Sequence, residues 1–495
     1  MTVMTNAPSD TRHATGSSRA SGAARMWAVV LASCAGQFLV VLDVSVVNTA
    51  LPSMRADLGL TAVGLQWVVN AYSIAFAGFM LLGGRAGDLF GRKRTFLVGL
   101  GLFTAASLAG GLAQDGALLL AARAGQGLGA AVLSPSTLAL LTSAVPEGPA
   151  RARAIATWTA VGAGGGAAGG LVGGVLTDVL SWRWTLLVNV PTGVLVLLLG
   201  AWRLVESRAP GGGGAHAGTS PADAPGGAQR LDVPGAVLVT AGLATLAYGI
   251  VQTEQAGWTA PATLVPLGAG LVLLAAFVAV EARTRVPLMP LKLFRVRSVS
   301  GANAAMFCNG AAMFCMWYFM TLYAQNVLGY GPMAAGLALM PSSGAVVLGS
   351  KLAPRLMRTL GARNVAVLGA LVAVLGFGWQ TTMDAHGAYV TAIMVPGILM
   401  MTGAGLAATP LASLATAGAA PGDAGLVSGL VNTSRTMGGA LGLAVLSTVA
   451  AARTGGATDP EALTAGYALA FATGTWIVLG GIVLMLLWLP ADRRR

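Results

Sequence analysis

The sequence predicts an all-α membrane protein with many spanning helices, and three observations carry that prediction. Of its 495 residues, 55% are hydrophobic and only 9% are charged, with a mean hydropathy of +0.75. Apolar stretches of about 20 residues, enough to cross a hydrocarbon core about 30 Å thick, follow one another almost end to end. Lys and Arg fall almost entirely between alternate stretches. A soluble globular domain has none of these properties.

Fourteen apolar spans can be placed along the chain. Residues 1–26 are polar and lack the apolar core of a signal peptide, so we expect a disordered cytoplasmic tail there. A linker rich in Gly, Pro and Ala at 206–232 separates the first six spans from the remaining eight. The spans lie approximately at 27–50, 62–83, 95–114, 117–142, 154–177, 184–202, 233–252, 262–281, 298–325, 333–350, 364–383, 388–411, 424–451 and 465–489.

The chain contains a weak internal repeat. The stretch GGRAGDLFGRKR, at 83–94 between the second and third spans, has a counterpart within 349–369, between the tenth and eleventh. Each is a cationic cytoplasmic hairpin entered through Gly, which suggests two six-span halves related by duplication. Two halves around a central cavity is the architecture of a transporter. The predicted units are an N-terminal half at 27–205, two inserted helices at 233–283, a cytoplasmic loop at 284–297, a C-terminal half at 298–490 and a basic tail at 491–495.

The net charge of +12 is explained by membrane topology. With the N-terminus inside, 24 of the 29 Lys and Arg lie in cytoplasmic segments, and three, Arg55, Arg183 and Arg453, lie in external loops. This is the positive-inside pattern, so we expect no nucleic-acid partner and both termini in the cytoplasm. The glycines of 83–94 also follow no strand, as a phosphate-binding loop would require.

Asp43 and Arg123 are charged residues within spans, where an ionised group costs at least about 3 kcal/mol. Asp43 lies nine residues before Pro52, roughly 13 Å below the outer surface, and Arg123 lies roughly 9 Å below the same surface. The matching depths allow a fixed ion pair that pins two helices, or a carboxylate that takes up and releases a proton. We favour the second, because buried ion pairs stabilise poorly and charges in membranes usually mark pathways.

Arg435 is the third charge within a span, about eleven residues in from the cytoplasm. No acidic residue of the C-terminal half lies at matching depth. Two interpretations remain open: the side chain snorkels toward the inner headgroups, or it lines the cavity and meets an anionic group of a substrate.

No catalytic or cofactor chemistry is expected. Cys34, Cys308 and Cys315 lie in spans without metal-ligand spacing, and none of the three histidines lies in a span. The sequence contains neither HExxH nor GxSxG, so we expect no enzyme, no metal and no cofactor.

The fifth and ninth spans carry the other signals. Glycines at 162, 165, 169, 173 and 174 give the fifth span a face almost without side chains, which favours close helix packing or bending. The ninth span mixes Met and aromatic residues with amides, which is typical of core packing but also of an adaptable wall for bulky ligands. The cavity candidates are Tyr72, Gln126, Asn303, Asn309, Tyr318 and Arg435.

Together these motifs resemble those of the major facilitator superfamily, and within it the fourteen-span drug:proton antiporters. The stretch at 83–94 is similar to the loop motif of the superfamily through Gly84, Asp88, Gly91, Arg92 and Lys93. LDVSVVNTALP resembles the first-span motif of the group, RAGQGLGAA the fourth-span motif and NTSRTMGGALG a later one. The glycine motif of the antiporters is matched by Gly165, Gly169, Gly173 and Gly174, but Gly170 stands where the group has Pro.

The resemblance implies export of hydrophobic drugs or antibiotics from a bacterial cell, by alternating access and driven by proton entry. It assigns proton coupling to Asp43 and Arg123, and we expect a monomer in the plasma membrane. Because Asp43 is the one clear carboxylate within a span, we expect neutral or monocationic substrates in preference to dications. A proton-coupled importer on the same fold is the alternative.

The stretch at 83–94 is also expected to act as a conformational gate. Asp88 would face the positive N-terminal end of a helix of the other half, and Arg92 would meet an acidic partner, with Glu147 as the candidate. Gly84 and Gly91 would shape the turn. Such contacts would form only when the cytoplasmic side is closed.

Overall fold

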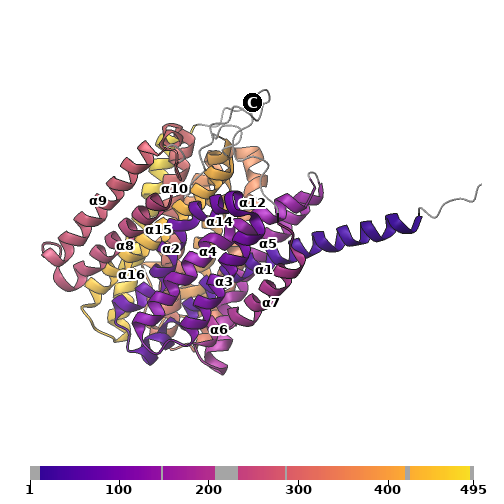
Figure 1. The fold of residues 1–495 in the computed structure, drawn as a ribbon. Coiled ribbons are helices and arrows are strands. Elements are labelled where there is room, and N and C mark those ends of the chain that lie inside the picture. Colours follow the sequence, from indigo (N-terminus) through magenta and orange to yellow (C-terminus); the bar gives the residue numbers. More distant parts are fainter. Residues whose placement is uncertain (1–11, 147–148, 207–231, 285–286, 418–423, 491–495) are drawn as a thin grey trace, which may run out of the picture.

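The computed structural model describes residues 12–146, 149–206, 232–284, 287–417 and 424–490. Every regular element in these ranges is helical (Figure 1). Within them, fourteen helical segments are long and apolar enough to cross a membrane, which confirms the predicted all-α class and the predicted number of spans. Glu147, most of the predicted linker and the basic C-terminal tail lie outside the described residues.

The N-terminal half is a bundle in which α4 is central. The helices α2 and α3 both pack along α4, while α1 packs along α5. The first helix begins at Arg12, so it extends through part of the segment expected to be a disordered tail, and it projects away from the bundle (Figure 1). The elements are α1 (Arg12–Leu58), α2 (Ala62–Phe90), α3 (Arg92–Gly111), α4 (Gly116–Ala144), α5 (Pro149–Val179), α6 (Trp184–Leu187) and α7 (Asn189–Arg203).

The C-terminal half repeats this arrangement with several broken helices. The tenth span is two helices, α11 and α12, that meet at Leu339, and short π-helical turns end α10 and precede α14. The elements are η2 (Leu291–Arg295), α10 (Arg297–Leu322), η3 (Tyr323–Val327), α11 (Pro332–Ala338), α12 (Met340–Leu360), α13 (Ala362–Gln380), η4 (Val390–Met394), α14 (Val395–Ala417), α15 (Ala424–Thr454) and α16 (Pro460–Trp488).

The two inserted helices form a hairpin on the side of the bundle. They are α8 (Val233–Ala256) and α9 (Pro261–Arg283), within the predicted range. The inner helix, α8, packs against α2 of one half and α15 of the other, and α9 packs on α8 at the edge of the molecule (Figure 1). The hairpin therefore bridges the two halves.

The predicted repeat is visible in the turns that follow the second and tenth spans. Gly91 separates α2 from α3 with φ 101°, and Gly361 separates α12 from α13 with φ 83°. A side chain is strained at such φ values, so one glycine at each place allows two long helices to join without a loop. Most of GGRAGDLFGRKR is consequently helical, because α2 continues to Phe90.

Candidate functional site

Asp43 and Arg123 are in direct contact inside the N-terminal half. The guanidinium Nη1 of Arg123 donates to Asp43 Oδ2 at 2.6 Å, which joins α1 to α4 as their matching depths predicted. Their side chains are 0% and 2% exposed. Each group is therefore the hydrogen-bonded counter-charge of the other in a site removed from water.

The second oxygen of Asp43 is held by two amides. Gln126 Nε2 and Asn189 Nδ2 each donate to Asp43 Oδ1 at 2.9 Å. Gln126 also accepts from Arg123 at 2.9 Å and donates to Ser107 Oγ at 2.7 Å. All are buried, so the carboxylate of α1 is satisfied by groups from α4 and α7, and Ser107 joins α3 to the network through Gln126.

Asn189 is a member of this network that the sequence analysis did not single out. It stands in the run TLLVNVPTG, where a single amide in an apolar span carries no charge to mark it. The structure places it at the break between α6 and α7, because Asn189 is the first residue of α7.

Arg123 is fixed on its other side by α2. Its Nε donates to the carbonyl oxygen of Val68 at 3.0 Å, and its guanidinium lies 4.5 Å from the ring centroid of Tyr72. The Tyr72 hydroxyl is directed at the carbonyl of Val40, 3.5 Å away. Tyr72, predicted as a cavity residue, therefore serves as a cation–π partner in this structure.

Glycines of α4 set the spacing that makes these contacts reachable. A Cβ on Gly127 would collide with the backbone carbonyl of Tyr72, and one on Gly129 would collide with the backbone of Phe103. The helices α2 and α3 therefore approach α4 to backbone contact on either side of Gln126. The motif RAGQGLGAA thus supplies both the polar side chains and the space around them.

The glycine motif of α5 has two faces with different partners. Gly165, Gly169 and Gly173 lie against α1, where added side chains would meet Phe38, Ser45 and the backbone of Val46. Gly174 lies against the backbone of α11 in the other half. Gly170, which replaces the usual Pro, also faces α11 and meets Gly336 there backbone to backbone.

Two hydrogen bonds join the halves near these glycines, at the end of the bundle where α1 and α5 terminate. The backbone N–H of Met333 donates to Asp178 Oδ2 at 2.9 Å, and Gln325 Nε2 donates to the carbonyl of Thr49 at 2.9 Å. This end of the interface is therefore closed in the structure.

A carboxylate of the N-terminal half binds the predicted gate at residues 83–94. Glu206, just after α7, accepts from the backbone N–H groups of Lys93 and Arg94 at 3.1 and 3.2 Å, which places it at the positive end of α3. Gly91 is required there, because a Cβ would collide with Glu206. The side chain of Asp88 lies outside the described side chains, and Arg92 is the first residue of α3.

Arg85, within residues 83–94, makes a hydrogen bond to the loop that leads into the C-terminal half. Its Nη2 donates to the carbonyl of Pro287, in the loop before α10, at 2.9 Å. Close backbone packing is made by Gly83, which contacts the carbonyl of Ala131, whereas a Cβ on Gly84 would meet Pro135 at an ordinary 3.7 Å.

The loop before α10 is also tied to the inserted hairpin. Glu281 Oε2 accepts from the backbone N–H of Met289 at 3.0 Å, and Asp232 Oδ1 accepts from Gly235 at the start of α8 at 2.9 Å. Both carboxylates are buried, and their remaining oxygens accept no hydrogen bond. Those two oxygens lie together, 2.7 and 2.9 Å from the Cβ position of Gly235.

The other cavity candidates belong to the C-terminal half. Asn303 is buried, and both ends of its amide are engaged, because it donates to the carbonyl of Val299 at 2.8 Å and accepts from Ser434 at 2.9 Å. Tyr318 is buried beside Phe319. Arg435 is half-buried, and its Nη2 donates to Asn432 Oδ1 at 2.8 Å.

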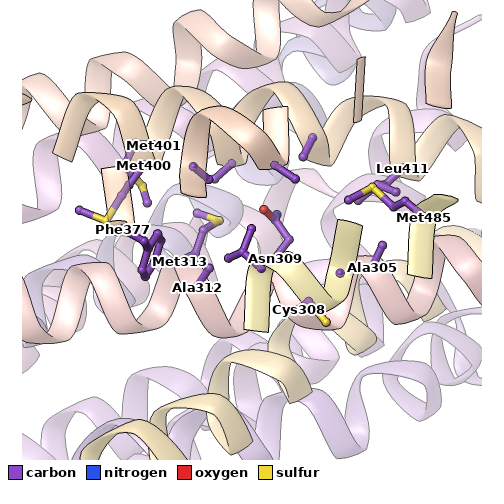
Figure 2. Close-up of a pocket in the computed structure, with 16 residues that line it drawn as sticks. Ala305, Cys308, Asn309, Ala312, Met313, Phe377, Met400, Met401, Leu411 and Met485 are labelled. Carbon is purple, nitrogen blue, oxygen red and sulfur yellow. The ribbon is translucent and has the colours of Figure 1, made fainter. Parts of the chain in front are cut away.

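Asn309 lies in a methionine-lined pocket enclosed by helices of the C-terminal half. Figure 2 shows its amide among the side chains of Met313, Met400, Met401 and Met485, with Phe377 at one end. These residues come from α10, α13, α14 and α16, so the pocket is separate from the Asp43 network. Thioether side chains are flexible, and both interpretations of the ninth span, core packing and an adaptable wall for a ligand, are compatible with this arrangement.

Comparisons with known proteins agree with this architecture. The chain is 46% identical over 469 residues to the "Cephamycin export protein CmcT" of Amycolatopsis lactamdurans, covering 94% of this chain and 93% of that protein. It is 37% identical over 484 residues to the "Puromycin resistance protein pur8" of Streptomyces alboniger, covering 95% and 92%.

Solved transporters have the same fold. An auto-inhibited peptide transporter of the POT family superposes with a TM-score of 0.67 at 17% identity, covering 95% of this chain and 98% of that one. A D-xylose–proton symporter superposes with a TM-score of 0.65 at 13% identity, covering 94% and 98%. The sequence model of the Major Facilitator Superfamily matches residues 33–443. The protein is therefore a multi-pass membrane protein that belongs to the major facilitator superfamily of transporters.

Proposed function

We propose that this protein is a proton-coupled antiporter that exports an antibiotic or similar hydrophobic compound from a bacterial cell by alternating access. The observation that carries the proposal is the buried network in which Asp43 is bound by Arg123, Gln126 and Asn189. When a carboxylate is paired with one arginine in an apolar interior, loss of its charge has large consequences for that arginine.

Protonation of Asp43 would remove the charge that compensates Arg123. The guanidinium would then lie buried with only neutral partners, Val68, Gln126 and the Tyr72 ring, which is unfavourable. A conformation that hydrates or re-pairs Arg123 gains relative stability as a result. Proton binding can therefore shift the population between two states of the transporter.

The burial of Asp43 supports alternating access. Its side chain is 0% exposed, so a proton reaches it only after the packing around it opens. With the N-terminus in the cytoplasm, the closed end formed by Asp178 and Met333 is the outer end. Opening of that end would admit a proton from outside, and opening of the other would release it inside.

The direction and the substrates follow from the relatives. CmcT is named for export of a cephamycin, and other relatives are named for resistance to puromycin and lincomycin. Export is therefore favoured over import, and a cephamycin is the first candidate substrate. We expect a monomer in the plasma membrane that uses the proton gradient and no cofactor, and that needs no nucleic acid.

Drug susceptibility tests the export function directly. In a bacterial host that lacks its own efflux pumps, expression should raise the inhibitory concentration of a cephamycin or of another antibiotic in a panel. Inside-out vesicles should then accumulate that drug when a pH gradient is imposed. Uptake in right-side-out vesicles with no accumulation in inside-out vesicles would support the importer instead.

The role of Asp43 is tested by Asp43→Asn, which keeps the size and loses the titratable group. We expect the variant to insert normally and to lose accumulation driven by the pH gradient. Asp384→Asn is the control, because Asp384 is an exposed loop residue. Undiminished proton-driven transport by Asp43→Asn would exclude Asp43 as the proton carrier.

A further inference from the structure

Arg435 is a membrane arginine whose charge is not compensated by a described carboxylate. It lies eleven residues after the first residue of α15, roughly 16 Å along the helix, and nine residues into the span Leu426–Thr454. Among the described residues, its hydrogen-bond partner is Asn432, an uncharged amide, and no described ion pair includes it. One of its five N–H donors is thus accounted for.

Arg123 provides an internal comparison, because it is also an arginine inside a span. Arg123 has a carboxylate at 2.6 Å, a second amide partner, a backbone carbonyl and an aromatic ring. The charges of Arg123 and Asp43 cancel. The described part of the membrane interior therefore carries one net positive charge, and that charge is on Arg435.

Snorkelling does not account for this position. Helical side chains point toward the N-terminus of their helix, and Arg435 bonds Asn432, one turn in that direction. Asn432 itself lies roughly 12 Å along α15 from Ala424. The guanidinium thus stays within the span and does not reach the headgroups.

The amide beside Arg435 has a hydrogen-bond donor whose described partner is a weak acceptor. The amide Nδ2 of Asn432 faces the thioether sulfur of Met80 at 3.2 Å, across the interface between α15 and α2. Sulfur is a weak acceptor, so this donor remains available for a better partner. A guanidinium fork beside an amide donor, at the junction of the two halves, matches the planar oxygens of a carboxylate.

We propose that Arg435 and Asn432 form a subsite that binds the carboxylate, or another singly charged oxyanion, of the exported compound. This inference rests on the proposed export function and names the substrate class for it. It differs from the sequence-based expectation of neutral or monocationic substrates. Both oxygens of Asp43 are occupied, Oδ2 by Arg123 and Oδ1 by two amides, so Asp43 offers no counter-charge to a cation in this structure.

Matched pairs of an acid and its ester test the subsite without any mutation. The probes are a cephamycin and its carboxylate methyl ester, and N-dansyl-phenylalanine and its methyl ester. Binding to the purified protein in detergent is measured by fluorescence and calorimetry. We expect each acid to bind about tenfold or more tightly than its ester, because a hydrogen-bonded charge pair contributes more than a neutral contact. Equal affinities, or no saturable binding of either acid, would overturn the proposal.

Substitutions test whether Arg435 is the residue that makes the protein bind the acid more tightly than the ester. Arg435→Gln should remove the preference for the acid and leave affinity for the ester unchanged, and Arg435→Lys should retain part of it. Arg453→Gln, the same change at the exposed end of α15, is the control and should behave as wild type. Equal loss of acid and ester binding in Arg435→Gln would indicate a structural role and contradict the subsite.

The two proposals fail in different ways. If the wild type exports a drug in the susceptibility panel yet binds acid and ester equally, the subsite is wrong and the export function stands. If no drug is exported while the acid preference depends on Arg435, the export function is wrong and the anion subsite stands.

Discussion

Removal of the Asn189 amide should slow transport without unfolding the protein. In Asn189→Leu, Asp43 Oδ1 loses one of its two amide donors, at 2.9 Å, and keeps the one from Gln126. A hydrogen bond to a charged group contributes about 1.5 to 3 kcal/mol, and the remaining donor makes the lower end the better choice. The substitution also removes Asn189 Oδ1, a buried acceptor that has no partner, so little stability should be lost.

That loss falls on the arrangement in which Asn189 bonds Asp43. Because about 1.4 kcal/mol corresponds to a tenfold change in an equilibrium constant, the population of this arrangement should fall about tenfold, and transport that passes through it should slow to a similar extent. The assay is drug-dependent proton flux in proteoliposomes, recorded with an entrapped pH dye. Asn48→Leu is the matched control, because the Asn48 amide bonds the carbonyl of Val44 in its own helix. Undiminished flux in Asn189→Leu would refute the reasoning.

Three further predictions concern other parts of the structure. Arg123→Lys keeps the charge but loses the planar fork that bonds several partners at once, so the same flux assay should show transport reduced at least about tenfold; wild-type flux would mean that charge alone suffices. Gly173→Ala should lower the free energy of unfolding by about 1 to 3 kcal/mol, because the added methyl group meets the backbone of α1. Gly164→Ala is the control and should leave the free energy of unfolding unlowered, because the position faces open space. Thermal unfolding in detergent measures both variants. Glu281→Gln should become more stable relative to wild type as pH rises, because an amide can donate to the free Asp232 oxygen whereas two carboxylates repel each other. Melting temperatures of the two proteins are compared at low and at high pH, and an equal difference at both would contradict this.

The sequence predicted the fold well because membrane insertion constrains it strongly. A hydrocarbon layer requires long apolar helices, so hydropathy alone located fourteen spans, and charge placement assigned the loops between them. The contact between Asp43 and Arg123 was predictable because charges in such spans are rare and their depths can be compared.

Features that depend on packing were not predictable in the same way. Asn189 joins the network through a helical break that hydropathy does not detect. Asp232 and Glu281 stand at the ends of their helices, where acidic residues are usually solvated, and only the folded hairpin brings their oxygens together. The contact from Arg85 to Pro287 depends on how the two halves are joined, which no local pattern specifies.

The contact of α5 with α11 has a consequence for how fast the two halves can rearrange. Interdigitated side chains would have to change rotamer before one helix could slide along the other. Gly170 and Gly336 instead present bare backbone to each other, and Gly174 does the same toward Pro332. Sliding of α5 along α11 therefore meets little steric resistance at this contact. The activation barrier for opening should then be set by the polar bonds at the end of the bundle, those of Asp178 and Gln325, which break as discrete events.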